Sequence, residues 1–247
     1  MRIERSGQVA VLRLENGKAN AISPSFLAGL QRLIGEIGDA RAAVMIGQGS
    51  AFSAGLDLPS LIELDRAAMR AFIVGFDEVM LRLFELPLPL VAAVNGHAVA
   101  GGCVLALQAD VRIGADREAR IGLNETQLGI GLPAAVVETL RAQVPGPSLA
   151  TIALEGRLVS PREALQLGVL HEVVPEPELL QRAVARAAAL AALPPAGVRM
   201  VKASLRRPAA AAARAAELSE AERWLDTWFA DESRGRLREA VARLKRG

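Results

Sequence analysis

The sequence predicts an α/β fold in which parallel strands are joined by helical crossovers. Short apolar runs typical of buried strands alternate with longer segments whose apolar residues recur every three or four positions. Alternation of this kind builds crossover units, which assemble into a largely parallel sheet. The chain of 247 residues is long enough for one large domain, alone or with an appendage, and such a domain needs no disulfide or metal to stabilise it.

The predicted strands share short apolar sequences bounded by turn residues, and they comprise residues 8–14, 42–46, 88–94, 111–115 and 171–174. The first predicted helix begins at Ser23 and Pro24, which are residue types preferred at an N-cap and a first helical position, and it continues to Gly38. The second covers residues 67–86 and ends at Pro87, because proline excludes further helix.

The last third of the chain, from Pro175 onward, is predicted to be helical, with helices at residues 176–193, 195–205, 208–230 and 233–246. Three shorter helices are predicted before it, at residues 103–109, 148–155 and 161–167. No flexible linker separates the last third from the preceding strands.

The composition argues against several kinds of partner. The formal net charge is +2 and no basic run is interleaved with aromatic residues, so we expect no nucleic-acid partner. No run of 18 apolar residues is present and the first residues lack the apolar segment of a secretory signal, so we expect no membrane partner. The single cysteine, Cys103, cannot form an internal disulfide, which is typical of a reducing compartment, and we expect a cytoplasmic protein. Two histidines and one cysteine without ligand spacing predict no metal site.

The stretch from Val91 to Asp110 combines a buried strand, a turn and a buried helix that opens on Gly101 and Gly102. Backbone N–H groups at a helix start have no partner within the helix, so they favour an anion or a developing oxyanion. A second glycine turn, at residues 53–57, also follows an apolar strand. If the two strands are neighbours, one N–H from each turn can converge on a single oxygen, which is the geometry of an oxyanion hole.

Glu125 is the other candidate for chemistry. It is the one charged residue in the largely apolar segment 121–130. Burial disfavours the ionised form of a carboxyl group, so the pKa of Glu125 is expected to rise towards that of a useful general base. A helix-start or surface glutamate is the ordinary alternative, and on these residues alone it stays open.

Five segments together resemble a known family. They are NGKANAIS at 16–23, FSAGLDL at 52–58, VNGHAVAGGC at 94–103, IGLNETQLGI at 121–130 and LEGRLVSPREALQLGVLHEVVP at 154–175. In this order and spacing they resemble the crotonase (enoyl-CoA hydratase/isomerase) superfamily over nearly the whole chain. The segments at 52–58 and 121–130 are most similar to its mitochondrial-type Δ3,Δ2-enoyl-CoA isomerase branch.

The resemblance implies a crotonase-type spiral of ββα turns over residues 1–190, which holds the active site. It also implies a C-terminal helical region over residues 191–247 that mediates contacts in a homotrimer or a dimer of trimers. The implied substrate is an acyl-CoA thioester, with CoA as part of that substrate and no separate cofactor. The thioester oxygen is expected between the backbone N–H groups of Leu56 and Gly101. The residues expected to bind CoA lie on two loops and are Lys18, Ala19, Asn20, Ser53, Ala54 and Asp57, the last as the residue that orients its turn.

One departure from the hydratase pattern indicates the reaction. Hydratases of this family resemble GGGCE at the central helix and carry a second glutamate after the next strand, and two carboxylates can hold one water molecule. This sequence has Val104 at the first position and retains Glu125 at the second. A single carboxylate can remove a proton from C2 and return it at C4. We therefore expect conversion of a 3-enoyl-CoA to a trans-2-enoyl-CoA, a step expected in unsaturated fatty-acid β-oxidation.

Four alternatives stay open. The chain can catalyse hydration or another crotonase-type reaction, or it can be a catalytically silent acyl-CoA-binding protein. A nucleotide-dependent dehydrogenase is disfavoured, because Gly47 and Gly49 form only a fragment of the dinucleotide-binding fingerprint. A serine hydrolase that pairs Ser53 with His97 is disfavoured by the lack of a GxSxG elbow.

Ordinary structural roles are expected for the remaining conspicuous residues. Cys103 is expected in the core. Lys202 and the arginines of the C-terminal helices can meet CoA phosphates, including across a subunit boundary, although solvated helix faces account for most of them. The aromatic residues near the end of the chain are expected to pack in the helical region or at an interface, and they are Trp224, Trp228 and Phe229.

Overall fold

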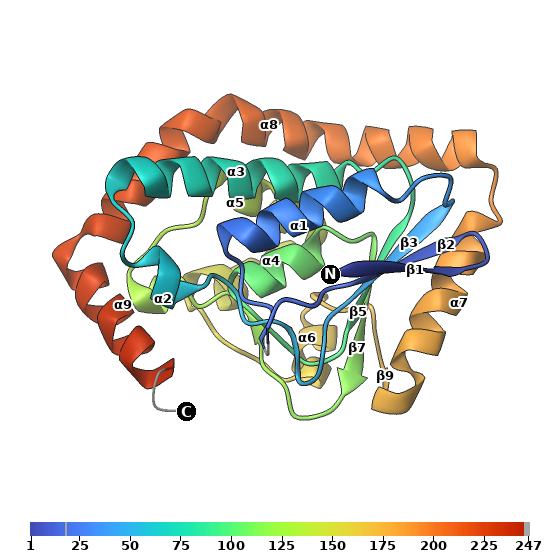
Figure 1. The fold of residues 1–247 in the computed structure, drawn as a ribbon, viewed down its shortest axis with the longest axis horizontal. Helices are drawn as coiled ribbons and strands as arrows, with labels where there is room; N and C mark the ends of the chain where they lie inside the picture. Colours follow the sequence, from blue (N-terminus) through green and yellow to red (C-terminus); the bar gives the residue numbers. More distant parts are fainter. Residues whose placement is uncertain (18, 245–247) are drawn as a thin grey trace.

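The main sheet has six strands in the order β1-β2-β3-β5-β7-β9 (Figure 1). The computed structural model describes residues 1–17 and 19–244. The β1–β2 pair is antiparallel and the other neighbouring pairs are parallel. All five residues of β3 and of β5 are buried, as expected for parallel strands covered on both faces. The strands are β1 (Arg2–Ser6), β2 (Val9–Arg13), β3 (Ala42–Ile46), β5 (Leu90–Val94), β7 (Val111–Asp116) and β9 (Glu172–Pro175).

A second sheet of three short parallel strands follows the main sheet along the chain. Its strands are β4 (Ala51–Ser53), β6 (His97–Val99) and β8 (Ile121–Gly122), in that order. Each comes directly after a strand of the main sheet, and a helix then leads the chain onward. These helices are α3 (Arg66–Phe84), α4 (Gly101–Leu107) and α5 (Ala134–Gln143). Successive ββα turns result, which confirms the predicted α/β spiral.

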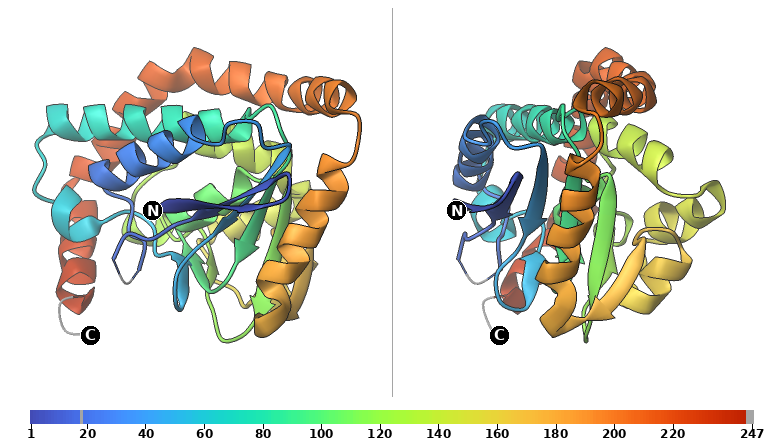
Figure 2. Two further views of the ribbon diagram at one scale, coloured as in Figure 1. Left: turned by 45° about the vertical axis from the view of Figure 1, so that its right-hand side comes forward. Right: turned by 90° about the vertical axis from the view of Figure 1, so that its right-hand side faces the viewer.

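Alternate residues of the main sheet enter two separate cores. In β3, Met45 lies in the larger core, whereas Val44 lies in a second core on the opposite face. Helix α7 (Leu179–Ala191) closes the second core by covering that face of the sheet (Figure 2). The larger core lies between the sheets and the helices, which include α1 (Pro24–Gly35).

Helix α8 (Pro195–Phe229) is continuous over 35 residues and crosses above α3 and α5 (Figure 1). The sequence predicted two helices here with a break before Pro208, and that prediction is wrong. A proline inside a helix removes one backbone hydrogen bond and costs roughly 3 kcal/mol. Packing on both sides of Pro208 keeps the helix continuous despite this cost. The buried residues on the two sides share one helix face and are Lys202, Arg206, Ala210 and Ala213.

Other element boundaries also differ from the sequence-based expectation. The predicted helix at 148–155 is a 3-10 turn, Gly146–Ser148, followed by a π-helical turn, Ala150–Leu154. Strands β1, β4, β6 and β8 and helices α2 and α5 were not predicted. The remaining elements are α2 (Leu58–Leu61), η1 (Thr126–Leu128), α6 (Pro161–Gln166), η4 (Glu176–Glu178) and α9 (Asp231–Leu244). The predicted helix at 233–246 corresponds to α9, and its last two residues lie outside the described part of the chain.

Within the described residues, no single helix is long and apolar enough to cross a membrane. Residues Glu176–Ala191 and Pro195–Phe229 reach that length and composition only when taken together, and they are bent by 106° at the break between them. The small residues Ala183 and Ala187 of α7 are fully buried in the second core.

Asp77 is a buried carboxyl group on α3 that faces the start of α5. Its Oδ2 accepts a hydrogen bond of 3.4 Å from the Ala135 N–H, and its Oδ1 has no partner among the described residues. Burial raises the pKa of Asp77 to about 7, well above its value in an unfolded chain. The folded protein therefore binds more protons than the unfolded chain between about pH 4 and pH 7, and the stabilisation is lost as pH rises through 7.

Replacing Asp77 by asparagine is expected to stabilise the protein at pH 8 and to flatten the pH dependence of unfolding. The amide keeps the shape and stays neutral, so the cost of a buried charge disappears. A shift of about three pKa units sets an upper limit of roughly 4 kcal/mol. Urea unfolding at pH 5 and pH 8 measures the effect. If the free energy of unfolding changes by the same amount between pH 5 and pH 8 in the variant and in the parent protein, this account of Asp77 is contradicted.

Candidate active site

Two glycine turns meet at the carboxyl ends of β4 and β6, which are adjacent because the strands pair in parallel. Gly102 packs directly on β4, since a Cβ built there would lie 2.1 Å from the Ser53 carbonyl oxygen. Gly55 has a φ of +86°, and a Cβ built on it would lie 3.2 Å from the Gly101 nitrogen. Both positions exclude larger residues, so glycine is what brings the two turns together.

Two backbone N–H groups at this junction, those of Leu56 and Gly101, have no acceptor within the described residues. Two adjacent groups are engaged: Asp57 N–H donates to the Ile22 carbonyl at 3.0 Å, and Ala100 N–H donates to the Gly122 carbonyl at 2.8 Å. The two free groups can therefore donate to an oxygen that is not part of this chain.

Ala100 has an unusual backbone at the start of α4, with a φ of +51° and a ψ of −125°. A residue with a Cβ costs of order 1–3 kcal/mol in such a conformation, which persists only when the surroundings impose it. The Ala100 carbonyl accepts hydrogen bonds from the N–H groups of Cys103 and Val104 at 2.8 and 3.0 Å. These bonds begin the helix and fix the direction of the Gly101 N–H.

Glu125 lies at the start of the 3-10 turn η1 and is 9% exposed. Its backbone carbonyl accepts hydrogen bonds from the N–H groups of Leu128 and Ile130 at 2.9 and 3.0 Å, so the turn is tightly closed. Its carboxylate Oε2 is buried without a hydrogen-bond partner in the described residues. Burial raises the pKa of Glu125 to about 7, against the weaker opposing effect of nearby backbone hydrogen bonds. The group is therefore poised to exchange a proton near neutral pH.

Leu56, Glu125 and Ile130 line both of two neighbouring cavities. The outer groove has a volume of about 560 Å³ and the inner cavity about 20 Å³. Gly101 and Val104 also line the inner cavity. Leu56, Gly101 and Glu125 thus line the same space. An oxygen held by the N–H groups places the adjoining carbon atoms beside a general base.

Residues 4–242 match the enoyl-CoA hydratase/isomerase family. The chain belongs to this family. It is 36% identical over 208 residues to human enoyl-CoA delta isomerase 1, mitochondrial, covering 82% of this chain and 68% of that protein. It is 38% identical over 205 residues to a putative enoyl-CoA hydratase of Thermus thermophilus, covering 79% of each. The fold is similar to the crystal structure of human mitochondrial Δ3,Δ2-enoyl-CoA isomerase, with a TM-score of 0.93 and 32% identity over 99% of this chain and 98% of the other. The crotonase resemblance is confirmed.

The C-terminal helices complete the site of this family member from within the same chain. Trp224 of α8 lines the inner cavity, and Arg243 of α9 lines the outer groove. Ser233 Oγ donates to the Gly129 carbonyl at 2.8 Å, and Gly131 N–H donates to Thr227 Oγ1 at 3.0 Å. These contacts support the turn that carries Glu125. The assignment of residues 191–247 to oligomerisation stays a prediction. The contribution of these helices to the site was not predicted, because no local sequence signal reports a contact between distant segments.

The loop expected to bind CoA is anchored to β4. Ala54 N–H donates to the Ala19 carbonyl at 2.9 Å, and Ser53 Oγ donates to the Asn20 carbonyl at 2.8 Å. Asn20 and Ser53 are fully buried, so their side chains hold the loop in place, whereas Ala54 lines the outer groove. Asp57 orients its turn by accepting a hydrogen bond of 2.8 Å from Ser60 Oγ, and it lines neither cavity. Lys18, which was also predicted to bind CoA, lies outside the described residues.

The structure gives no support to a serine or cysteine nucleophile. Ser53 Oγ is bonded to the Asn20 carbonyl, and His97 Nδ1 accepts instead from the Arg120 N–H at 3.1 Å. Cys103 is a fully buried core residue, and burial raises the pKa of its thiol to about 12.

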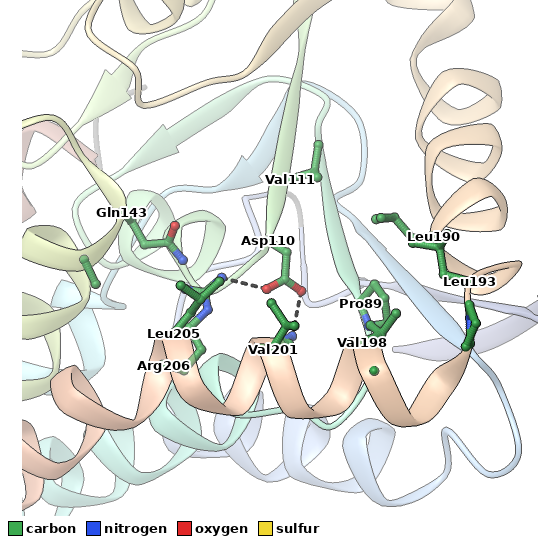
Figure 3. Close-up of a pocket in the computed structure, with 14 residues that line it drawn as sticks. Pro89, Asp110, Val111, Gln143, Leu190, Leu193, Val198, Val201, Leu205 and Arg206 are labelled. Atoms are coloured by element: carbon green, nitrogen blue, oxygen red, sulfur yellow. Dashed lines mark hydrogen bonds and ion pairs between the residues drawn. The ribbon is translucent and has the colours of Figure 1, made fainter.

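A separate cavity, of about 710 Å³, is lined by neither Glu125, Leu56 nor Gly101 (Figure 3). Two cations converge there on one carboxylate: Lys202 Nζ and Arg206 donate to Asp110 at 2.6 and 2.7 Å. Lys202 also donates to the Leu88 carbonyl at 2.9 Å. Within this chain Lys202 is not placed beside the Glu125 site, because its ammonium group is committed to this buried network and lines a different cavity. A contact with CoA phosphates across a subunit boundary stays a prediction. This cavity offers no general base for the chemistry described above.

Proposed function

We propose that this family member is a Δ3,Δ2-enoyl-CoA isomerase. The observation that carries the proposal is that Glu125 is the one carboxylate among the described residues lining the inner cavity and the outer groove. Val104, at the position where the hydratase pattern has its other glutamate, is a buried wall of the inner cavity. A single carboxylate can move a proton from one carbon atom to another. Holding and activating a water molecule requires a second carboxylate, which this site lacks among the described residues.

The proposed reaction begins with the thioester oxygen bound by the Leu56 and Gly101 N–H groups. Glu125 removes a proton from C2, and the C2–H electrons form a dienolate whose negative charge rests on the thioester oxygen. The protonated carboxyl then returns the proton at C4, which moves the double bond from C3–C4 to C2–C3. The N–H groups stabilise the dienolate more than the substrate, and in other enzymes one such donor contributes roughly 3–4 kcal/mol.

The outer groove is the proposed site of the CoA moiety. Its volume of about 560 Å³ suits an extended ligand, and the exposed Arg120 and Arg243 lie along it. Neither arginine forms an ion pair within the described residues, so both are available to phosphates. Sequence reasoning did not single out these two positions, which line one groove only because α9 packs against α2 and η1. Ala19, Ala54 and Lys18 remain proposed CoA contacts, and a trimeric assembly in the cytoplasm remains our expectation.

Hydration is the second candidate, because relatives such as the Thermus thermophilus protein are named as hydratases. Turnover of 3-hexenoyl-CoA, followed by the absorbance of the conjugated product, tests isomerisation directly. A decrease in the same absorbance, measured with trans-2-hexenoyl-CoA as substrate, tests hydration, because hydration removes the conjugated double bond. We expect isomerisation to be the faster reaction by at least ten-fold, and faster hydration would overturn the proposal.

The rate of isomerisation is expected to rise with pH and to level off above about pH 7. Glu125 must be ionised to accept the C2 proton, and its pKa is raised to about 7. Below that pH the group is already protonated in the free enzyme, so kcat/KM falls about ten-fold per pH unit. A profile of kcat/KM from pH 5 to pH 9 measures this. A plateau that extends down to pH 5 would show that a group with an ordinary carboxyl pKa is the base.

A further inference from the structure

We infer that Thr227 and Ser233, at the corner between α8 and α9, are positioning residues that hold the Glu125 carboxylate in place for proton transfer. The inference deepens the proposed function and rests on it, because it takes Glu125 as the base that moves the proton. Neither Thr227 nor Ser233 lines the inner cavity or the outer groove, so both act through the segment that carries Glu125.

The Glu125 carboxylate is held by its own segment. Its Oε2 has no hydrogen-bond partner among the described residues. The groups that favour its ionised form by hydrogen bonding are the backbone N–H groups of Asn124 and of Glu125 itself. A general base is usually oriented by the side chain of a further residue, and within the described residues none has that role here. The direction of the carboxylate therefore depends on where the backbone on both sides of Glu125 is held.

The two sides of Glu125 are held in different ways. Before it, β8 pairs with β6, so the sheet fixes the chain. After it, residues 129–131 include two glycines, and a glycine can be held only through its backbone because it has no side chain to pack. Arg236 of α9 donates to the Gln127 carbonyl at 3.0 Å, but its side chain is exposed and such bonds contribute little.

Thr227 and Ser233 supply the buried hydrogen bonds to these two glycines. Ser233 Oγ donates to the Gly129 carbonyl at 2.8 Å, and Gly131 N–H donates to Thr227 Oγ1 at 3.0 Å. The Thr227 hydroxyl itself donates to the Trp224 carbonyl at 2.7 Å, so its oxygen is left to accept from Gly131. The two bonds hold alternate residues of the segment that follows the base.

The corner that carries Thr227 and Ser233 is itself anchored in the core. Helices α8 and α9 meet there at a sharp bend (Figure 1). Trp228 and Leu237, one from each helix, are completely buried, and Ser233 is 3% exposed. Close-packed side chains of this kind resist displacement. A firmly packed corner thus holds a glycine-rich segment, and the segment holds the base.

Thr227→Val is expected to lower kcat for 3-hexenoyl-CoA by about 10- to 100-fold, because a displacement of about 1 Å at the base costs roughly 10²-fold. Valine has the shape of threonine but leaves the Gly131 N–H without its acceptor. KM should stay within about three-fold of the parent, since the Leu56 and Gly101 N–H groups that hold the thioester lie on other turns. Thr227→Ser keeps the hydroxyl and should restore kcat to within about three-fold of the parent.

The pKa of Glu125 distinguishes positioning from a loss of stability. Burial raises it to about 7, so a loosened segment that admits water should lower this pKa by about 1 or more, towards the ordinary value of 4.5. Thr227→Val changes no charge, and the titratable groups around the base stay the same: Arg120 and Arg243 line the outer groove, and the Cys103 thiol lies on the core side. Carbon-13 NMR of protein labelled at the glutamate carboxyl groups measures the pKa, with the signal assigned by its absence in Glu125→Gln.

Thr139→Val is the matched control. Thr139 is a buried threonine of α5 whose Oγ1 donates to Gln108 Oε1 at 3.4 Å, and it lines neither cavity. The same substitution there should lower stability while kcat and the pKa of Glu125 stay as in the parent. Ser233→Ala removes the other hydrogen bond and should repeat both effects of Thr227→Val, so the test stays decisive if Thr227→Val fails to fold.

The NMR measurement separates this inference from the proposed reaction, since it needs no turnover. If the parent isomerises no 3-enoyl-CoA but the pKa of Glu125 falls in Thr227→Val and Ser233→Ala and not in Thr139→Val, the proposed function fails and the positioning role stands. If the parent isomerises and Thr227→Val and Ser233→Ala keep the parent kcat and the parent pKa, the positioning role fails alone. An equal loss of kcat in Thr139→Val and Thr227→Val also overturns it, because a general loss of stability then accounts for both.

Discussion

Glu125→Gln is expected to lower kcat for 3-enoyl-CoA isomerisation by about 10³-fold or more, within the upper range that general acid–base catalysis contributes. Glutamine keeps the size and polarity of the side chain, but its amide cannot accept the C2 proton. The Leu56 and Gly101 N–H groups are backbone atoms, so the thioester should still bind. Single-turnover kinetics with 3-hexenoyl-CoA, together with a binding titration of hexanoyl-CoA, separates the chemical step from binding.

Glu125→Gln is also expected to change the stability of the protein. Burial raises the pKa of Glu125 to about 7, so ionisation of this group costs folding free energy above that pH. Stability from the neutral form is present at low pH and is lost as pH rises through 7. The neutral glutamine avoids this cost, so Glu125→Gln should unfold at a higher temperature than the parent protein at pH 8 and at a similar temperature at pH 5. Inactivity combined with higher stability excludes misfolding as the reason for the lost rate.

Glu155→Gln is the matched control for both measurements. Glu155 is exposed and lies near the same loop, where its backbone carbonyl accepts a hydrogen bond of 3.3 Å from Gln127 Nε2. Its replacement changes the net charge by the same amount and should leave kcat and the pH dependence of unfolding unaffected. If Glu125→Gln keeps more than a tenth of the parent rate, another group must be the base.

The parts of the fold that the sequence predicted are those with strong local patterns. Strands β3 and β5 are continuous apolar runs, and α3 carries a regular apolar face that ends before Pro87. Strands β4, β6 and β8 have only two or three residues, which is too short for any periodicity to appear. Helix α5 was missed because Pro133 precedes it without a capping side chain, so the usual start signal is lacking.

The residues of the candidate site likewise differ in whether a local sequence feature reveals them. Gly101 and Glu125 were found because each has a local anomaly, a glycine pair at a helix start and a lone charge in an apolar segment. Trp224 has no such anomaly, since an aromatic residue on a helix face is ordinary core. Its position on the inner cavity follows from α8 crossing α3 and α5, which is a contact between segments about a hundred or more residues apart. The sequence pattern also could not tell that Ser53 and Asn20 hold the loop and that Ala54 faces the groove.

Gly55→Ala is expected to reduce kcat/KM by 10²- to 10³-fold, the effect of losing one oxyanion donor in other enzymes. A Cβ at this position would lie 2.6 Å from the Val99 carbonyl oxygen and 3.0 Å from the Ala100 Cβ. The first contact is shorter than real Cβ atoms show and the second is tight, so the two turns must separate. The φ of +86° adds strain for any residue with a side chain. Separation moves the Leu56 N–H away from the Gly101 N–H, and one oxygen can no longer be bound by both.

Gly49→Ala distinguishes this geometric effect from backbone strain. Gly49 has a φ of +60°, similar in sign to that of Gly55, but a Cβ built there meets nothing within 4 Å. Both variants should lose roughly 1 kcal/mol of stability from the positive φ, and Gly55→Ala should lose more because of its short contacts, as measured by urea unfolding at pH 7. Only Gly55→Ala should lose the catalytic rate, and the loss should appear in kcat more than in KM, because the second donor matters most when negative charge develops on the oxygen. Equal rate losses in the two variants would mean that loop strain, and not the spacing of the two N–H groups, controls the reaction.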